Sequence, residues 1–197
     1  MTLLRGVALI GALAVVSAGI AGAGWVLMGD RAQQTLTPDD FGRGDYRLVT
    51  TDGQPFTQDS LQGAPSLVFF GFTHCPDVCP TTLGDIGLWQ ETLGDEARDL
   101  RIFMISVDPE RDTPEVLAEY IGWLPGAVGV TGSEAESLKA QGAFRVFARK
   151  VPLEGDDYTM DHSSSVLAFD ARGRFVTNIS YQSPPEIALE RVRQALR

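Results

Sequence analysis

The most constraining feature of this sequence is a long uncharged segment near its amino-terminal end. Residues 6–29 contain no Asp, Glu, Lys or Arg and consist mostly of Gly, Ala, Val, Leu and Ile. As a helix, about 24 residues at about 1.5 Å each would extend about 35 Å, enough to cross the hydrocarbon layer of a bilayer. We therefore predict a membrane anchor in residues 1–30, in the form of a transmembrane helix.

A cleaved signal peptide is the alternative interpretation, because Ala21-Gly22-Ala23 resembles a small-residue cleavage site. The uninterrupted apolar length favours an anchor that is retained. Arg5 and the amino terminus form the positive flank, so the amino terminus is expected to stay inside. With either interpretation the rest of the chain lies outside the cytoplasm, in the periplasm if the source is bacterial.

The remaining sequence predicts one domain of ordinary size. Residues 31–44 mix polar residues with Pro38 and glycine and are expected to form a linker, followed by a single domain in residues 45–197. The whole chain has 197 residues and a net charge of -10. Nucleic acid is disfavoured as a partner, because binding to phosphate groups needs a basic surface.

Apolar patterns within the domain alternate between strand and helix periods, with glycine turns such as Asp52-Gly53 and Arg172-Gly173. Their order predicts an α/β domain in which helices cover a central mixed sheet. It is compatible with a thioredoxin-like fold, although periodicity leaves other α/β folds open. Strands are expected at 46–50, 66–72, 101–107, 145–151, 165–169 and 174–180, and helices at 80–93, 115–123, 134–141 and 186–196.

The two cysteines of the chain, Cys75 and Cys79, follow a buried strand directly and precede a helix expected to begin at Pro80. A disulfide closing so short a loop would constrain the unfolded chain little, so chemistry explains the pair better than stability does. A helix N-terminus lowers thiol pKa values and favours the thiolate, which is both a nucleophile and a metal ligand. This position alone leaves redox and metal chemistry open.

Two thiolates make an incomplete metal site, and histidine is a suitable third ligand. His74 directly precedes Cys75, and neighbouring residues of an extended segment point in opposite directions, so we expect His74 to pack beside the loop. His162 lies just before the expected strand 165–169, in a loop that would lie over the cysteines if that strand paired with the first buried one. Spacing alone leaves a surface position open for His162.

The segment from Phe70 to Leu83, FGFTHCPDVCPTTL, resembles the signature of the Sco/SenC copper proteins. Three later stretches resemble the family in the same order, namely SVDPERDT from Ser106, YTMDH from Tyr158 and the glycine turn at Gly173. The resemblance extends over residues 45–196, which is nearly the whole predicted domain.

This resemblance implies a thioredoxin-like fold and a copper site with Cys75 and Cys79 as thiolate ligands and His162 as the imidazole ligand. Two thiolates and one imidazole suit Cu(I), and with a further weak ligand they also accommodate Cu(II). The sequence departs from the family at Leu167, where tyrosine is frequent, and at the turn formed by residues 171–173. Both departures affect packing rather than the ligands.

Acidic residues around these motifs have two interpretations each. Asp77 in the cysteine loop either changes the basicity of the thiols or is a solvated loop residue. Asp161 either orients His162 by a hydrogen bond or helps to form a turn. Residues 108–114 are expected to form a loop and the start of a helix, with a docking face as the alternative.

By resemblance, the protein is a metallochaperone rather than an enzyme. It would deliver copper to the copper A centre in subunit II of cytochrome c oxidase and interact with other copper chaperones. The alternative is a thiol–disulfide oxidoreductase that acts on exported proteins through Cys75 and Cys79. A Trp-Cys-Gly-Pro-Cys motif and a proline directly before Ser165 are absent, which argues mildly against that role alone.

Two other functions are weaker hypotheses. A copper or redox sensor that signals through the membrane anchor would need a partner kinase or regulator. A peroxidase is disfavoured, because Val68 and Phe72 stand where the peroxiredoxin pattern has proline and threonine.

Overall fold

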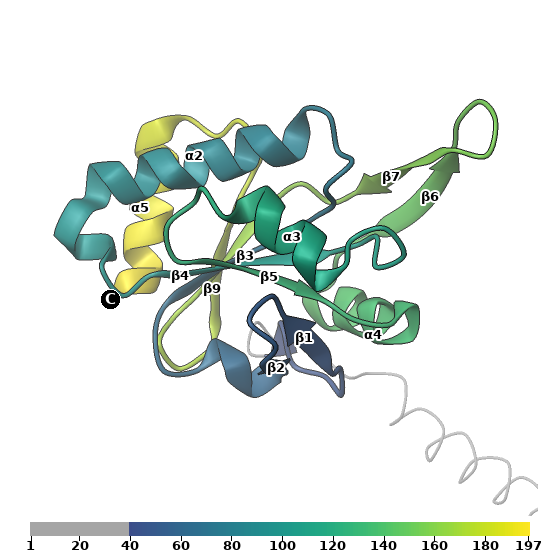
Figure 1. The fold of residues 1–197 in the computed structure, drawn as a ribbon. Helices are drawn as coiled ribbons and strands as arrows, with labels where there is room; N and C mark the ends of the chain where they lie inside the picture. The colour runs from purple at the N-terminus through teal and green to yellow at the C-terminus, as the bar shows by residue number, and fades with distance from the viewer. Residues whose placement is uncertain (1–39) are drawn as a thin grey trace, which may run out of the picture. The chain divides into compact units, whose positions relative to one another are not determined.

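The computed structural model describes residues 40–197. Seven strands form one mixed sheet in the order β2-β1-β5-β4-β3-β8-β9, and a separate two-stranded ribbon joins β6 to β7 and projects from the sheet (Figure 1). The strands are β1 (Leu48–Thr50), β2 (Pro55–Phe56), β3 (Ser66–Gly71), β4 (Arg101–Ser106), β5 (Ala127–Thr131), β6 (Ala148–Pro152), β7 (Tyr158–His162), β8 (Val166–Phe169) and β9 (Phe175–Ile179).

Helices cover both faces of the seven-stranded sheet (Figure 1). The α2 helix (Val78–Leu93) lies beside α5 (Pro185–Leu196), and α3 (Pro114–Ile121) packs on β5 on the same side. The α4 helix (Glu134–Phe144) lies on the opposite face. Strands β4-β3-β8-β9, with α2 between β3 and β4 and α5 after β9, form the arrangement expected of a thioredoxin-like domain. The predicted α/β fold with a mixed sheet is therefore confirmed.

The register of β3 determines where the functional residues meet. All six residues of β3 are buried, because the strand lies between β4 and β8 and is covered on both faces. β3 runs parallel to β4, so the carboxyl ends of the two strands share one edge of the sheet. β8 runs antiparallel to β3, with Phe69 opposite Val166, so the residues before β8 reach that same edge. The loop after β3 and the end of β7 are thus brought together.

The sequence patterns do not predict β5, which is inserted between β1 and β4. Its glycine, Gly129, lies directly under α3: a Cβ there would be 2.9 Å from the Cβ of Leu117. This close approach requires glycine, and glycine in turn interrupts the apolar run that would have indicated a strand. Both predicted hairpin turns are present, with Gly53 at φ 81° and Gly173 at φ 72°.

The region around His162 also differs from the expectation. The strand expected at 145–151 begins at Ala148, because Arg145 ends α4 in the left-handed conformation, with φ 55°. His162, expected in a loop before the strand at 165–169, belongs instead to β7, which pairs with β6. His162 is therefore the last residue of a strand, opposite Ala148 of β6, and the next residue, Ser163, donates its N–H to the Phe147 carbonyl at 3.0 Å.

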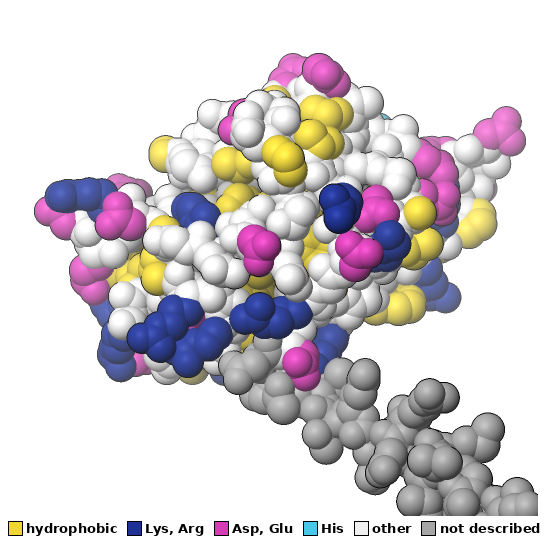
Figure 2. Space-filling model, turned by 90° about the horizontal axis from the view of Figure 1, so that it is seen from below, with side chains coloured by type: hydrophobic (Ala, Val, Ile, Leu, Met, Phe, Trp, Pro, Cys, Tyr) yellow, Lys and Arg dark blue, Asp and Glu magenta, His cyan; other side chains and the backbone are white. Residues whose placement is uncertain are grey.

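None of the helices within residues 40–197 is long and apolar enough to cross a membrane. The transmembrane helix expected in residues 1–30 lies outside the described part of the chain, as does the linker up to residue 39. Figure 2 shows one face of the described domain, on which Lys and Arg side chains gather although the net charge of the chain is -10. On this face Asp and Glu side chains lie among the Lys and Arg side chains (Figure 2).

Phe144 holds α4 on the sheet. Its ring is 1% exposed and lies 5.7 Å from the ring of Tyr46, 5.2 Å from Phe70 and 5.8 Å from Phe169. We expect Phe144→Ala to lower the free energy of unfolding by about 3 kcal/mol or more, through lost burial and the cavity left behind. Urea denaturation measures this change. Leu138→Ala on the same helix is the control, because Leu138 is 58% exposed and should change stability by about 0.5 kcal/mol at most.

Candidate metal centre

The cysteine loop leads directly into α2. The helix begins at Val78, so Cys79 lies in its first turn and Cys75 in the preceding loop. The sequence suggested that Pro80 is the first helical residue, but it is the third. Proline is tolerated there because it has no backbone N–H, and an N–H in the first turn of a helix has no partner within the helix. Asp77 occupies the N-cap position without a side-chain capping bond. The backbone N–H of Cys79 instead donates to Sγ of Cys75 at 3.3 Å.

Cys79 rests on the end of the sheet. A Cβ at Gly71 would lie 2.7 Å from Cε1 of Phe69, 3.0 Å from Sγ of Cys79 and 3.2 Å from Cε of Met104. Only glycine therefore leaves room for the Cys79 side chain at the end of β3. Cys79 is 0% exposed, whereas Cys75 is half-buried. The two cysteine residues thus differ in their exposure to solvent.

The imidazole of His162 faces Cys79 from the end of β7. Its Nε2 lies 3.6 Å from Sγ of Cys79, and its Nδ1 lies 2.9 Å from the carbonyl oxygen of Ser163. Because a carbonyl only accepts, Nδ1 carries a hydrogen, and Nε2 is the ring nitrogen that faces the thiols. The rings of Phe72 and Phe69 approach the imidazole edge-on, at 5.7 Å and 6.3 Å between centroids.

The three residues predicted as ligands lie together. One ligand atom from each of Cys75, Cys79 and His162 can be chosen so that all three atoms lie within 4.8 Å of one another. A surface pocket lined by Cys75, Met160 and His162 opens beside them. His74 stays outside this group: it is exposed, and its Nδ1 lies 3.1 Å from Oγ1 of Thr73.

The interpretation of Asp161 as a partner of His162 is wrong. The Asp161 carboxylate accepts a hydrogen bond from Nε of Arg149 at 3.1 Å. Successive residues of a strand point to opposite faces, so the Asp161 side chain leaves the ribbon on the side away from the imidazole. The carbonyl oxygen of Ser163 takes the place expected for the carboxylate.

The two thiols have opposite pKa shifts. A hydrogen bond from the Cys79 thiol lowers the pKa of Cys75 to about 4; burial opposes this shift, and His162 supports it. The same interaction, together with burial, raises the pKa of Cys79 well above its ordinary range. At neutral pH the pair therefore shares one proton, with Cys75 as the thiolate and Cys79 as the thiol.

The loop between β4 and α3, residues 107–113, supports the segment before Cys75. Its Asp112 is 0% exposed and accepts hydrogen bonds from the N–H of Thr73 at 3.2 Å and from the hydroxyl groups of Thr73 and Ser106, both at 2.6 Å. Burial raises the pKa of this carboxyl. Thr113 caps α3 by accepting from the N–H of Val116, so the predicted loop and helix start are confirmed. The contact with Thr73 had no signal in the sequence.

Comparison with known proteins extends the resemblance noted in the sequence. The SCO1/SenC family matches residues 34–197 of this chain. The SCO2-like protein of Rickettsia felis is 38% identical over 150 residues, which cover 75% of this chain and 73% of the relative. The match therefore includes the whole described domain and its metal centre.

Solved structures agree with the fold. Bradyrhizobium japonicum ScoI with copper bound is 40% identical and superposes with a TM-score of 0.70, covering 78% of this chain and 99% of that one. BsSco, a member of the Sco family of cytochrome c oxidase assembly proteins in which a disulfide switch was identified, is 26% identical with a TM-score of 0.62, covering 83% and 98%. On the sequence match and this shared fold, the chain belongs to the SCO1/SenC family.

Proposed function

We propose that this protein is a copper metallochaperone that binds one copper ion through Cys75, Cys79 and His162. We further propose that it delivers the ion to the copper A centre in subunit II of cytochrome c oxidase. The convergence of the three ligand atoms within 4.8 Å carries the proposal. The copper bound to Bradyrhizobium ScoI and the place of BsSco among oxidase assembly proteins support it.

The donor set fits Cu(I). Two sulfur atoms and one imidazole nitrogen are soft or borderline ligands, whereas Mg²⁺, Ca²⁺ and Mn²⁺ prefer oxygen. The buried carboxylate near the site, Asp112, is already occupied by Thr73 and Ser106. Metal ligands must be deprotonated, and Cys75 meets this condition near neutral pH, so the proton of Cys79 is the one that binding releases from the thiols.

The different exposure of the three proposed ligands predicts the order in which they release the copper ion. Cys75 and His162 border the open pocket, whereas Cys79 is 0% exposed. Thiolates of an acceptor would therefore reach the ion from the side of Cys75 and His162 and displace these ligands first. Cys79 would be the last of the three to let the ion go.

The proposal includes the place of action. The apolar segment in residues 1–30 would hold the domain at the outer face of the membrane, next to a membrane-bound oxidase. Because the copper A centre is the acceptor, the proposed site must work outside the cytoplasm, where thiols are readily oxidised. Reduction of the Cys75–Cys79 pair is then a condition for Cu(I) binding.

X-ray absorption on the full-length protein loaded with one equivalent of Cu(I) tests the proposal. We expect two sulfur ligands and one nitrogen ligand, with the nitrogen lost in His162→Ala. Structural zinc sites with four ligands have binding free energies of about 10–16 kcal/mol, or about 2.5–4 kcal/mol per ligand. Loss of one ligand of this strength in His162→Ala should lower the Cu(I) affinity about 100-fold. His74→Ala is the matched control and should leave both the spectrum and the affinity unchanged. Unchanged affinity in His162→Ala would contradict the three-ligand site.

A thiol–disulfide oxidoreductase is the second candidate, favoured by the low pKa of Cys75 and by the disulfide switch of BsSco. The Cys75 thiolate would attack a substrate disulfide and form a mixed disulfide. Cys79, after losing its proton, would then attack the Cys75 sulfur, leaving the substrate reduced and this pair oxidised. Stoichiometric reduction of a disulfide by the His162→Ala variant, at the wild-type rate, would favour this function.

A further inference from the structure

The loop at residues 107–113 also contacts the ribbon that carries His162. Asp108 accepts a hydrogen bond from the hydroxyl of Tyr158 at 2.7 Å and one from Nε of Arg111 at 2.5 Å. The Arg111 guanidinium lies 3.8 Å from the centroid of the Tyr158 ring and donates to the Tyr158 carbonyl at 3.0 Å. We call these three residues the clamp.

The charge pair of the clamp, Asp108 and Arg111, is well shielded from water. The side chain of Asp108 is 0% exposed and that of Arg111 is 19% exposed. A charge pair in such surroundings is little screened by salt, and removing one partner leaves the other charge buried without compensation. The clamp is therefore a firm attachment, unlike the exposed ion pairs elsewhere on this domain.

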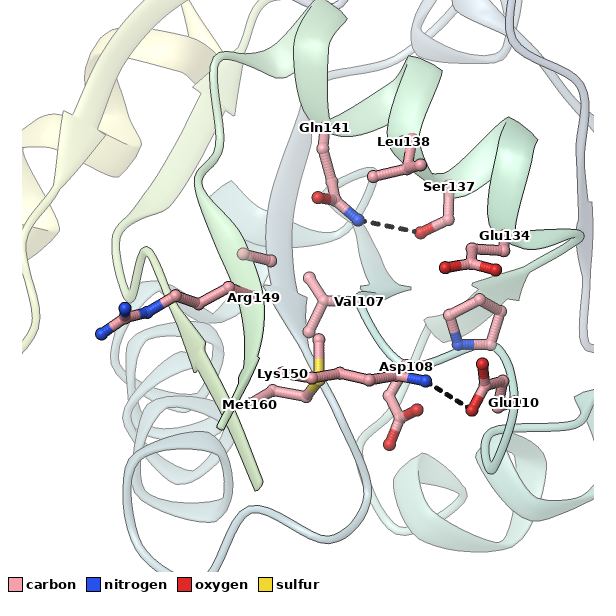
Figure 3. A pocket seen from close by; sticks show the side chains of 12 residues that line it. Val107, Asp108, Glu110, Glu134, Ser137, Leu138, Gln141, Arg149, Lys150 and Met160 are labelled. Atoms are coloured by element: carbon pink, nitrogen blue, oxygen red, sulfur yellow. Dashed lines mark hydrogen bonds and ion pairs between the residues drawn. The ribbon is translucent and has the colours of Figure 1, made fainter. Parts of the chain in front are cut away.

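A fourth side chain approaches Tyr158 from the ribbon itself. Nζ of Lys150 lies 4.7 Å from the centroid of the Tyr158 ring and 2.5 Å from a carboxylate oxygen of Glu110. Figure 3 shows Lys150 reaching from β6 to Glu110 at the pocket between the loop, α4 and the ribbon. The Tyr158 ring thus contacts one cation from the loop and one from the ribbon.

The position of Tyr158 affects the position of the His162 imidazole, because one strand of the ribbon carries both residues. β6 and β7 pair with each other and form a sheet separate from the seven-stranded one. Tyr158 is the first residue of β7 and His162 is the last, four residues later and on the same face of the strand. Met160 lies between them on that face and packs against the core. A strand of this length is short and stiff, so fixing Tyr158 restricts where His162 can lie.

One loop therefore contacts both halves of the site: Asp112 binds the segment before Cys75, and the clamp binds the strand that ends in His162. We propose that this loop holds the thiols and the imidazole at binding distance, with Arg111 and Tyr158 as positioning residues for His162. The inference rests on the proposed function, because its measurable consequence is the affinity for copper. Without the clamp, the ribbon keeps its contacts through Met160 and Lys150, but the Tyr158 end of β7 is no longer fixed, and the imidazole has a wider range of positions.

The double variant Arg111→Gln/Tyr158→Phe tests the proposal on the full-length protein. It removes the guanidinium and the hydroxyl while keeping a polar chain and an aromatic ring. We expect the Cu(I) affinity to fall about 10-fold, the lower end of the loss that follows removal of a direct hydrogen-bond partner of a metal ligand, because these residues act on His162 through the strand; the nitrogen signal in X-ray absorption should weaken. In a His162→Ala background the same change should alter the affinity by less than about twofold, because no imidazole remains to be positioned.

The matched control is Arg101→Gln/Tyr46→Phe. Arg101 donates three hydrogen bonds to backbone carbonyl groups, and the Tyr46 hydroxyl donates to another. This control removes the same two chemical groups at a distance from the clamp, and we expect copper affinity to stay unchanged. Should the clamp double variant fail to fold, Tyr158→Phe alone is expected to show the same dependence on His162 to a smaller extent.

Equal losses of affinity with and without His162 would show that the clamp acts through the fold in general, and would overturn the inference. Unchanged affinity and an unchanged nitrogen signal in the folded double variant would overturn it as well. Failure of the proposed function looks different. In that case the wild-type protein binds no copper, or His162→Ala binds it as tightly as the wild type.

Discussion

Cys79→Ser is expected to lower the Cu(I) affinity of this protein by about a thousandfold, at the upper end of what one ligand contributes in a metal site. The hydroxyl that replaces the thiol is a hard ligand and stays protonated at neutral pH, so it cannot substitute for a thiolate. Because Cys79 is 0% exposed, no water molecule takes its place easily. Competition with a Cu(I) chelator of known affinity measures the loss.

The same variant separates ligation from folding. Serine is close to cysteine in size, so the contacts of position 79 with Gly71 and with the end of the sheet should persist. Urea denaturation of Cys79→Ser without copper is therefore expected to resemble that of the wild type. Copper affinity close to that of the wild type would exclude Cys79 as a ligand.

The reactivity of Cys75 toward iodoacetamide is expected to stay nearly constant from pH 8 to pH 5. A lowered pKa means that the thiolate persists to lower pH, and a pKa of about 4 leaves Cys75 mostly ionised at pH 5. An ordinary thiol with a pKa of about 8.5 would lose reactivity several-hundred-fold over the same interval. Mass spectrometry of the alkylated peptides, without copper, gives the rate at each pH.

Cys79→Ala supplies the control for this experiment. The Cys79 thiol is the largest cause of the low pKa of Cys75, so its removal should move the pH profile of Cys75 toward that of an ordinary thiol. His162→Ala removes a smaller cause and should move the profile less. A wild-type rate that falls tenfold for each pH unit below 8 would refute the assignment of Cys75 as the thiolate.

Much of this arrangement was predictable from local patterns. The apolar run of β3 followed by two cysteines placed both thiols at the junction of sheet and helix, because a buried strand and a helix start each leave a signal in a few adjacent residues. His162 was predicted as a ligand through its surrounding motif. The structure brings it within 3.6 Å of Cys79 by the antiparallel pairing of β3 with β8.

The features that the sequence did not predict depend on contacts between residues far apart in the chain. β7 lies outside the main sheet and lacks a buried face along its whole length, so its sequence shows no clear alternation. The acceptor for Nδ1 of His162 is a backbone carbonyl, which any residue supplies, and only the direction of the strand excluded Asp161. The hydrogen bond from Tyr158 to Asp108 joins residues 50 positions apart, so no short sequence motif could predict it.

The separation of the ribbon from the seven-stranded sheet has a consequence for the engineering of this protein. The thiols belong to the part of the chain that the hydrophobic core determines, whereas the imidazole belongs to a hairpin whose strands pair only with each other. Exchanging residue 162, while Met160 and Tyr158 keep their contacts with the core and with Asp108, therefore changes the metal preference without rebuilding the core. Position 162 is the one to randomise in a library of metal carriers, and the strand–cysteine–helix unit is the segment to keep constant.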